Sequence, residues 1–483
     1  MALSYEQRPI DVNQKVPAIT EWTPLIGVML YQSSVAGYFY HKLIVEVKLG
    51  ATIIGKIKQR RNGYDDDITN NRARAFFDIT DIANSVLIDT LWDQNLSGSP
   101  FGSIHFLGAN DTSKIFSNNG DYKKGYHQIA RLEHKGYEEY SSSESASPIE
   151  YPATSVSYTC NYMRASLPLH TPRNTNTDFV QSDAFSKFTA DTTTDLFLTD
   201  ANLVARAEYG LTNVIRTYIK QGQSHTIAFL NNYDYFGSDV KQVEVTYYDA
   251  TGAVLQTGTI ANTAAAGAGG IDPTTAGLTE KESLLYFGCG TFQLKVTDYA
   301  AIANINTAAY YRVELQSAAG NPRSRPIYFI IQDNLCDAAN NKYPTVRLAW
   351  INSKGCYDYW NFSYKSIKSI DVKRNQYSSV IGRHDGSKYT YNNSDSPRIT
   401  RDVTATRKMV INSGFIEPED VALMESLVMS RGVWVMESQA EIKSVSIKET
   451  SITRKTNIND RLKIMYTFTI EFTNELNQAS ETV

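Results

Sequence analysis

The side chains of this chain that could do chemistry are its histidines, cysteines and carboxylates, and their spacing matches no common site. The seven histidines form no HxH or HExxH pair and lie in no Cys/His cluster, so a zinc site of the local sequence type is not expected. The acidic run at 65–67 offers hard oxygen ligands but lacks the spacing of a calcium loop, and we interpret it as a solvated loop. We expect no bound metal and no cofactor.

Nucleophile and nucleotide motifs are also missing. There is no GxSxG elbow, no papain-type cysteine signature, and no Walker or Rossmann fingerprint after a predicted strand. The glycine-rich run at 264–270 has no GK[ST] ending, so we interpret it as a surface loop. Two carboxylates could cleave a glycan, but nothing in the sequence selects a pair. We therefore predict that the chain is not an enzyme.

The cysteines also match no common site. Cys160, Cys289, Cys336 and Cys356 lie far apart, which fits neither a zinc ribbon nor a disulfide framework. We interpret them as buried thiols.

Composition places the chain among globular proteins. Hydrophobic residues make up 42%, the mean hydropathy is −0.34, and the net charge is −4 with a pI near 6.0. These values argue against a disordered chain and against a globally basic nucleic-acid binder. No window approaches the roughly 20 apolar residues of a membrane helix. The first residues lack the pattern of a secretory signal, so we expect no membrane contact and no Sec export.

The elements that would position any functional residue are predicted to be strands. Tyrosine is abundant, with 31 residues, and its combination with Thr, Ser, Asn and Val is typical of sheets. We predict a mainly β fold, with several β-sandwich-like domains and a small α+β C-terminal module. The predicted parts are an N-terminal β-rich domain at 1–140, an irregular connector or arm at 141–205, a middle β-sandwich domain at 206–335 and a C-terminal β-rich domain at 336–483.

Local patterns predict individual elements. Apolar and polar residues alternate over 43–47, before a turn at Leu49–Ala51, and over 243–248, before a turn at Asp249–Gly252. The clearest helix signal lies near 417–431, where a proline and acidic residues open an apolar stripe that ends at a glycine.

The connector prediction rests on composition. The run SSSESAS at 141–147, with the prolines that follow it, is typical of a flexible linker. From there to about residue 200 the chain shows little periodicity, so it is either disordered or laid across a neighbour. We favour an arm that becomes ordered on assembly.

The segment at 347–369, RLAWINSKGCYDYWNFSYKSIKS, predicts a hairpin of aromatic strands around Gly355. Aromatic residues of this kind suit packing and protein contact rather than catalysis. The candidate assembly contacts are Trp350, Tyr357, Tyr359 and Trp360. The alternative is that the tyrosines of this chain simply cover sheet faces.

Basic residues outnumber acidic ones between Lys365 and Lys408. Such a stretch could line a passage for DNA through unspecific attraction of phosphates. The candidate lining residues are Lys365, Lys368, Lys373 and Arg374. An exposed strand face or an ion-paired contact is the favoured alternative, because acidic residues are interspersed.

Several segments carry a resemblance to a known family. They are YFYHKLIVEVKLG, FFDITDI, WINSKGCYDYW followed by SYKSIKS, SGFIEPEDVALMESLVMSRGVWVME, and SITRKTNINDRLKIMYTFTIEF. In them the chain resembles virion structural proteins of Bacteroides-infecting phages, and is most similar to tail ring and tail-barrel components of crAss-like podoviruses. Cys356 stands where a second glycine would be expected after Gly355.

The resemblance implies a structural protein of the phage tail that forms a ring with copies of itself between the portal and the distal tail. It also implies contacts with other tail ring or portal proteins, and assembly in the cytoplasm of the host bacterium. A receptor- or glycan-binding adhesin built of β-sandwiches is the alternative function, with exposed aromatic rings stacking on sugars. A tail hydrolase is a third.

Overall fold

A computed structural model describes a large part of the chain. The described residues are 3–7, 18–21, 26–31, 39–60, 73–87, 116–118, 129–166, 197–232, 240, 242–261, 282–294, 306–317, 319–332, 344–437, 442–449, 451–453, 464–473 and 476–479. Strands dominate them, so the predicted mainly β fold is confirmed. The chain divides into two compact units, of which the first holds Met1–Leu335 with Ile351–Asp358 and the second holds Cys336–Trp350 with Tyr359–Val483.

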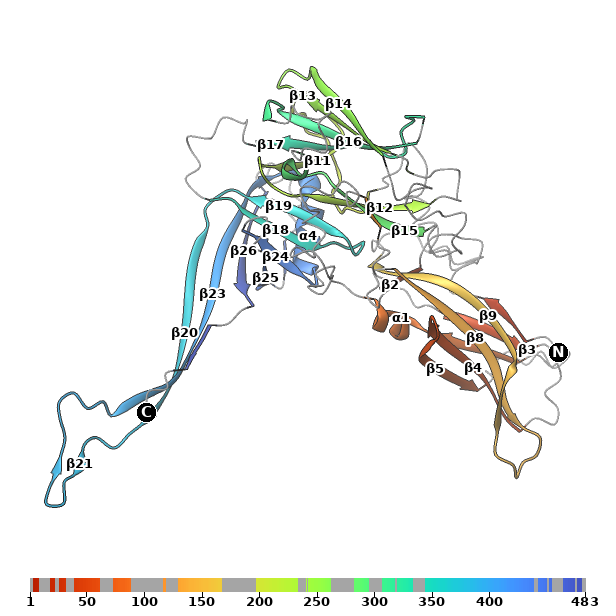
Figure 1. Cartoon of the computed structure of the whole chain (residues 1–483), viewed down its shortest axis with the longest axis horizontal. Helices are drawn as coiled ribbons and strands as arrows, with labels where there is room; N and C mark the ends of the chain where they lie inside the picture. The colour runs from red at the N-terminus through yellow and green to blue at the C-terminus, as the bar shows by residue number, and fades with distance from the viewer. Residues whose placement is uncertain are drawn as a thin grey trace. The chain divides into compact units, whose positions relative to one another are not determined.

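The N-terminal part of the first unit contains two sheets, with strand orders β1-β3-β6 and β2-β9-β8-β4-β5 (Figure 1). Their elements are β1 (Leu3–Gln7), β2 (Ala18–Glu21), β3 (Ile26–Tyr31), β4 (Phe39–Leu49), β5 (Thr52–Arg60), β6 (Ala73–Asp78), α1 (Thr80–Val86), β8 (Ile129–Ser141) and β9 (Ile149–Ser166). Leu43, Val45 and Val47 alternate along β4 into the core. The predicted turn after β4 is present, and Gly50 adopts the positive φ of +59° that closes it.

The core of this part holds a buried histidine. The His134 Nε2 atom and the Tyr162 hydroxyl lie 2.8 Å apart, and the ring of His134 stacks on Tyr158 with centroids 4.6 Å apart. Burial lowers the pKa of His134 to about 3. The side chain is therefore neutral and belongs to the packing of the domain.

The middle part of the first unit is built on a six-stranded sheet of order β10-β11-β17-β16-β13-β14 and a three-stranded sheet of order β12-β15-β7. Their elements are β7 (Phe116–Asn118), β10 (Leu203–Val204), β11 (Val214–Ile219), β12 (Thr226–Asn232), β13 (Gln242–Tyr248), β14 (Val254–Ala261), β15 (Glu282–Gly288), α3 (Thr291–Leu294), β16 (Tyr310–Gln316) and β17 (Ile327–Ile331). The predicted hairpin of β13 and β14 is present. Asp249 stabilises its turn by accepting backbone hydrogen bonds from Thr251 at 2.8 Å and Ala253 at 2.9 Å.

The second unit is built on an eight-stranded sheet of order β19-β18-β24-β25-β26-β23-β20, with β27 paired to β23. Its elements are β18 (Val346–Ile351), β19 (Tyr357–Phe362), β20 (Ile367–Ser378), β21 (Arg383–His384), β22 (Tyr389–Thr390), β23 (Arg398–Ile416), η7 (Pro418–Asp420), α4 (Val421–Met429), β24 (Val433–Met436), β25 (Ile442–Ile447), β26 (Ile464–Phe472) and β27 (Leu476–Ala479). The predicted helix is present as η7 and α4, with the proline in the first turn.

The predicted connector is wrong over residues 141–166. Strand β9 pairs with β8 from Ile149 to Met163, and the SSSESAS run is the loop of this hairpin. The run has the composition of a linker because it forms an exposed turn, and the strand after it is polar because one of its faces is exposed. Residues 167–196 of the predicted connector lie outside the described residues. Its last part, 197–205, is described, and there β10 pairs with β11.

The cysteines of the described part agree with their interpretation. Cys160, Cys289 and Cys356 are buried, and none of the three forms a disulfide. Cys336 lies outside the described residues.

Candidate functional site

The most distinctive surface of the second unit is a long hairpin, formed by β20 and the first half of β23. It runs away from the rest of its own sheet and ends in the small β21–β22 pair (Figure 1). We call residues 365–408 the arm. The two strands pair antiparallel from Ile367, opposite Val410, to Ser378, opposite Arg398.

The arm is ordered locally by its own side chains. Asp385 accepts hydrogen bonds from the backbone of Lys388 and of Ser387, each at 2.9 Å, and these bonds lower the pKa of its carboxyl group. Gly382 has a φ of +81°, and a Cβ atom there would lie 2.2 Å from the carbonyl oxygen of Thr390. The tip is therefore a defined turn.

All twelve residues of β20 are exposed, on both faces of the ribbon. Several of them are large and apolar, including Ile370 at 58% and Val372 at 48%, and Val380 beyond the strand is 82% exposed. Exposed apolar side chains grouped on a projecting element are typical of a contact surface. Strand β27 pairs with β23 over residues 402–405, so this part of the arm has three strands, with β20 at one edge.

One face of the arm continues the core face of the sheet. Residues directly opposite each other on antiparallel strands lie on the same face of the sheet. Such pairs connect Trp350 with the arm across the sheet. They are Trp350 with Val433, Val433 with Val445, Val445 with Phe472, Ile470 with Met409, and Met409 with Lys368. At its start, Trp350 Nε1 donates a 2.8 Å hydrogen bond to Ser426 Oγ of α4, so the helix covers this face there. At its end, the face is exposed.

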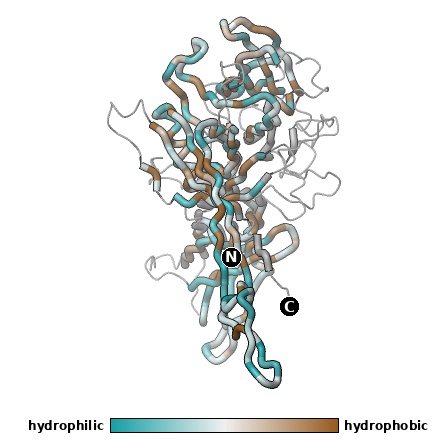
Figure 2. The backbone as a smooth tube through the Cα atoms, turned by 90° about the vertical axis from the view of Figure 1, so that its left-hand side faces the viewer, coloured by the Kyte–Doolittle hydropathy of each residue, from teal (hydrophilic) through white to brown (hydrophobic). Residues whose placement is uncertain are grey.

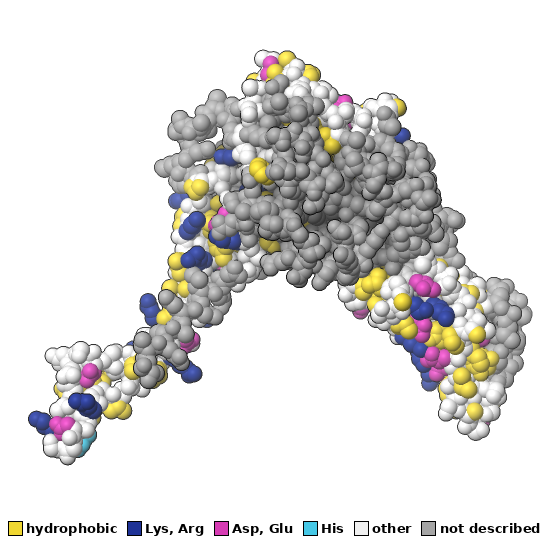
Figure 3. Space-filling view, viewed as in Figure 1, with side chains coloured by type: hydrophobic (Ala, Val, Ile, Leu, Met, Phe, Trp, Pro, Cys, Tyr) yellow, Lys and Arg dark blue, Asp and Glu magenta, His cyan; other side chains and the backbone are white. Residues whose placement is uncertain are grey.

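We call the exposed end of this face the apolar arm face. Its residues are Lys368, Ile370, Val372 and Arg374 of β20 with Val403, Ala405 and Arg407 of β23. Its aliphatic side chains are flanked by basic ones, and Figures 2 and 3 show hydrophilic and hydrophobic residues interspersed along the arm. Strand β20 is the last in the sheet order, so its outer edge has no strand partner within the described residues.

The predicted DNA lining is not a single surface. Side chains alternate along β20, so Lys368 and Arg374 share the apolar arm face whereas Lys373 lies on the opposite face. Lys365 precedes the strand. On the opposite face Lys408 forms ion pairs with Asp371 and Glu471, and the bond to Asp371 raises the pKa of Lys408. The four residues therefore do not form one basic track.

The predicted aromatic contacts also require correction. Trp350, Tyr357, Tyr359 and Trp360 are 0%, 4%, 2% and 7% exposed. Arg347 contacts the ring of Tyr359 from 5.0 Å and donates a 2.9 Å hydrogen bond to Asn361. The predicted turn is present, with Gly355 at a φ of +75°. The aromatic residues pack inside the chain and are not presented to a neighbour.

Sequence reasoning did not single out Ile370 and Val372, which the structure shows as exposed apolar residues. The signal that could have found them is the 12-residue run IKSIDVKRNQYS, which has no glycine or proline and alternates aliphatic with polar residues. Its alternation is weak because both faces are exposed.

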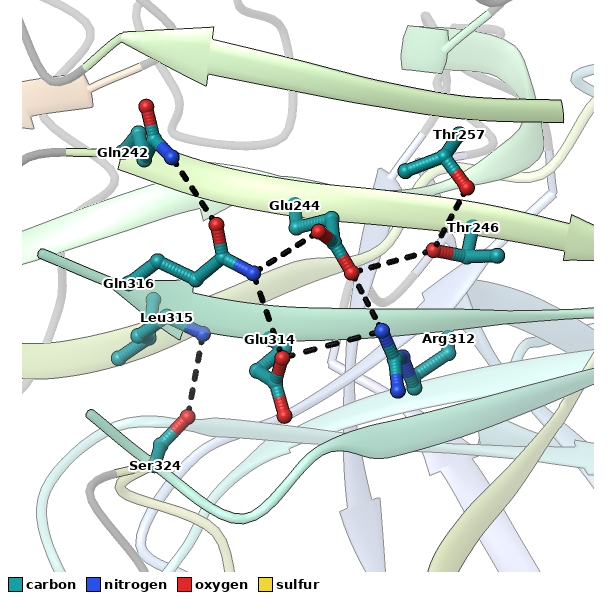
Figure 4. Close-up of polar contacts among 9 residues, drawn as sticks. All are labelled: Gln242, Glu244, Thr246, Thr257, Arg312, Glu314, Leu315, Gln316 and Ser324. Atoms are coloured by element: carbon teal, nitrogen blue, oxygen red, sulfur yellow. Dashed lines mark hydrogen bonds and ion pairs between the residues drawn. The ribbon is translucent and has the colours of Figure 1, made fainter. Parts of the chain in front are cut away.

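A second surface with chemical character is the polar face of the six-stranded sheet (Figure 4). Arg312 forms an ion pair with Glu244, lies 3.8 Å from Glu314, and is flanked by Gln316, whose Nε2 donates to Glu244 at 2.9 Å. Burial acts to lower the pKa of Arg312, but the neighbouring carboxylates outweigh it and raise the pKa. The two carboxylates of this cluster share the single cation, Arg312.

Aromatic rings share this polar face. Tyr248 and Tyr310 occupy the next opposed position of β13 and β16, and their rings stack with centroids 4.8 Å apart. Tyr310 is 3% exposed, whereas Tyr248 and Tyr328 are half-buried. The accessible parts of the Tyr248 and Tyr328 rings, beside hydrogen-bonding side chains, could contact a flat apolar ligand face, whereas Tyr310 supports them from below the surface.

The described part of the chain has no helix long and apolar enough to cross a membrane. It also has no group of three or more metal-ligating side chains.

Comparisons with known proteins identify no family. No family model matches the chain, and no curated protein matches it. Among solved structures, the native conformation of Escherichia coli alpha-2-macroglobulin is 8% identical, with a TM-score of 0.16, over 84% of this chain and 21% of that chain. The chain thus spans about a fifth of that protein's length. A likeness of this size carries no argument about fold or function.

Proposed function

We propose that the chain is a structural protein of a bacteriophage virion. It is a tail ring, or tail-barrel, component that assembles as a multimeric ring between the portal and the distal tail. It performs no catalysis, and it binds copies of itself and neighbouring tail or portal proteins. Assembly takes place in the cytoplasm of the host bacterium.

The observation that supports this proposal best is the arm. A projecting ribbon with Ile370 and Val372 about half exposed would be a liability in a monomer, because such an edge invites association. In an assembly the same ribbon has a partner. A head-to-tail contact that closes by rotation produces a ring, and the sequence resemblance to tail ring proteins points to the same kind of assembly.

The test is the assembly state of the purified full-length chain. Analytical ultracentrifugation over a concentration series should show a discrete oligomer, and negative-stain images should show closed rings. Mass spectrometry of purified phage tails should find the chain in them. A chain that stays monomeric at every concentration and is absent from tails would overturn the proposal. Unspecific contact with DNA in the tail channel is a subordinate part of it.

The polar face of the six-stranded sheet supports a second candidate function, a glycan-binding adhesin. The stacked pair Tyr248 and Tyr310 beside Arg312 and Glu244 is the observation in its favour. Titration with capsular polysaccharide, followed by calorimetry, tests it. Binding that is lost in Tyr248→Ala, with the chain exposed on the intact virion, would favour the adhesin over the ring.

A further inference from the structure

We infer that the apolar arm face docks on a second copy of this chain, so that the arm links one subunit of the ring to the next. The inference rests on the proposed function and adds to it the identity of the partner and the surface that binds it.

The first argument is the continuity of the sheet. The face that carries Trp350 under α4 is the face that carries Ile370 and Val372 on the arm. These two residues are 58% and 48% exposed in the single chain. Covering a surface of this kind removes apolar area from water, which favours association.

The second argument concerns the class of the partner. Nucleic acid would favour a track of basic side chains that follow one another along a face. Here Ile370 and Val372 separate Lys368 from Arg374, and Arg407 lies opposite Ile370 on the neighbouring strand. The other basic residue of β20, Lys373, lies on the opposite face. Aliphatic side chains with basic neighbours fit a protein surface that offers both apolar area and carboxylates.

The third argument is charge complementarity. Residues 365–408 hold ten Lys or Arg and four Asp or Glu, a net charge of +6. The rest of the chain therefore holds the other 37 basic and 47 acidic residues of the totals, 47 and 51, a net charge of −10. The arm of one copy and the body of another attract each other, and such attraction steers association and its orientation.

The arm is long enough to reach a neighbour. Residues 370–378 of β20 lie beyond the part of β23 that pairs with β26, and at about 3.3 Å for each residue they span about 30 Å. This length is about the diameter of a small domain. The partner that fits the apolar face, the charge and the reach is the next copy of the chain.

A pair of charge reversals tests the inference. Lys368→Glu with Arg374→Glu places acidic groups on the apolar arm face, and Lys373→Glu places one on the opposite face of the same strand. We expect the double variant to raise the dissociation constant of the oligomer by about tenfold or more, and the control variant to change it by less than about threefold. Circular dichroism and thermal unfolding should be unchanged, since all three positions are exposed.

A cross-linking experiment identifies the partner. A benzophenone group on Val372→Cys is activated in a mixture of unlabelled and ¹⁵N-labelled chains, with and without double-stranded DNA, and adducts are mapped by mass spectrometry. Adducts that join a labelled to an unlabelled peptide are expected. The same group on Lys373→Cys should give few of them.

The outcomes separate this inference from the proposed function. Equal effects of the two charge changes, no mixed-label adduct, or a dominant adduct with DNA would overturn the docking of the arm on a second copy, even where rings form. A wild-type chain that never oligomerises would overturn the ring itself. Rings that weaken only in the double variant, with mixed-label adducts at Val372→Cys, support both.

Discussion

The hydroxyl of Thr199 donates a 2.6 Å hydrogen bond to a carboxylate oxygen of Asp358, although the two residues are 159 positions apart. Both belong to the first unit. The other oxygen of Asp358 accepts bonds from the backbone of Asp200 at 2.8 Å and from the amide of Asn352 at 3.1 Å. Burial, and next the nearby charge of Asp200, raise the pKa of Asp358 to about 6.

The raised pKa of Asp358 predicts that the stability of the fold depends on pH. The folded pKa lies above the unfolded value near 3.8, so the contribution of Asp358 to stability is full below pH 4 and is lost as the pH rises through about 6. The loss amounts to about 3 kcal/mol at most. In Asp358→Asn this dependence disappears, because an amide does not ionise. Thermal unfolding at pH 4.5 and pH 7.5 should show that the stability of the variant rises relative to that of the wild type as the pH rises. A stability difference that is the same at both pH values would contradict the raised pKa of Asp358.

For His134, in the core of the N-terminal sheets, we predict the opposite dependence of stability on pH. Its folded pKa, about 3, lies below the unfolded value of 6.5, so its contribution is full above pH 6.5 and is lost as the pH falls toward 3. The stability lost in this way is about 5 kcal/mol at most. In His134→Gln the amide can still meet the Tyr162 hydroxyl and cannot take up the proton. We expect the variant to be less sensitive to acid, measured by urea unfolding at pH 4.5 and pH 7.5.

Gly414 is predicted to resist substitution. Its φ is +71°, and a Cβ atom would lie 2.0 Å from the ring of Tyr364. Gly414→Ala should therefore lower the free energy of unfolding by about 3 kcal/mol, from backbone strain and overpacking together. Gly50→Ala is the matched control, because its φ is +59° with nothing within 4 Å of the added atom. It should cost about 1 kcal/mol. Equal losses in urea unfolding would show that the contact with Tyr364 is unimportant.

Trp350 is predicted to act in folding and not in assembly. Trp350→Ala should lower the free energy of unfolding by about 3 to 5 kcal/mol, since the ring is fully buried. Ser426→Ala should cost about 1 to 3 kcal/mol by leaving the indole N–H without its partner. Denaturant unfolding measures both. A Trp350 variant with native stability and weakened self-association would restore the earlier prediction that this ring is an assembly contact.

Sequence periodicity predicted the local elements better than the surfaces. The turns at Gly50, Asp249 and Gly355 and the helix beginning at Pro418 follow from residues that act on their own backbone, and these are present. Whether an aromatic strand faces a core or a neighbour depends on what packs against it. The burial of Trp350 requires Ser426 and the rest of α4, which the sequence does not place beside it.

The exposure of the arm could not be predicted from the sequence either. Its basic excess was visible in the sequence, but its exposure depends on β20 standing at the end of the sheet order. The alternation that separates Lys373 from Arg374 could have been predicted, had the strand been recognised. The connector prediction failed because serine-rich composition is shared by linkers and by exposed hairpin turns such as 141–147.

Strand β23 is a single element of 19 residues, Arg398–Ile416, that runs from the arm into the sheet beside β26. A pull along this ribbon would load its ladder of hydrogen bonds in shear, many at once, instead of unzipping them one after another. In the proposed tail ring, a load on the arm would therefore be carried by many hydrogen bonds of the sheet at the same time.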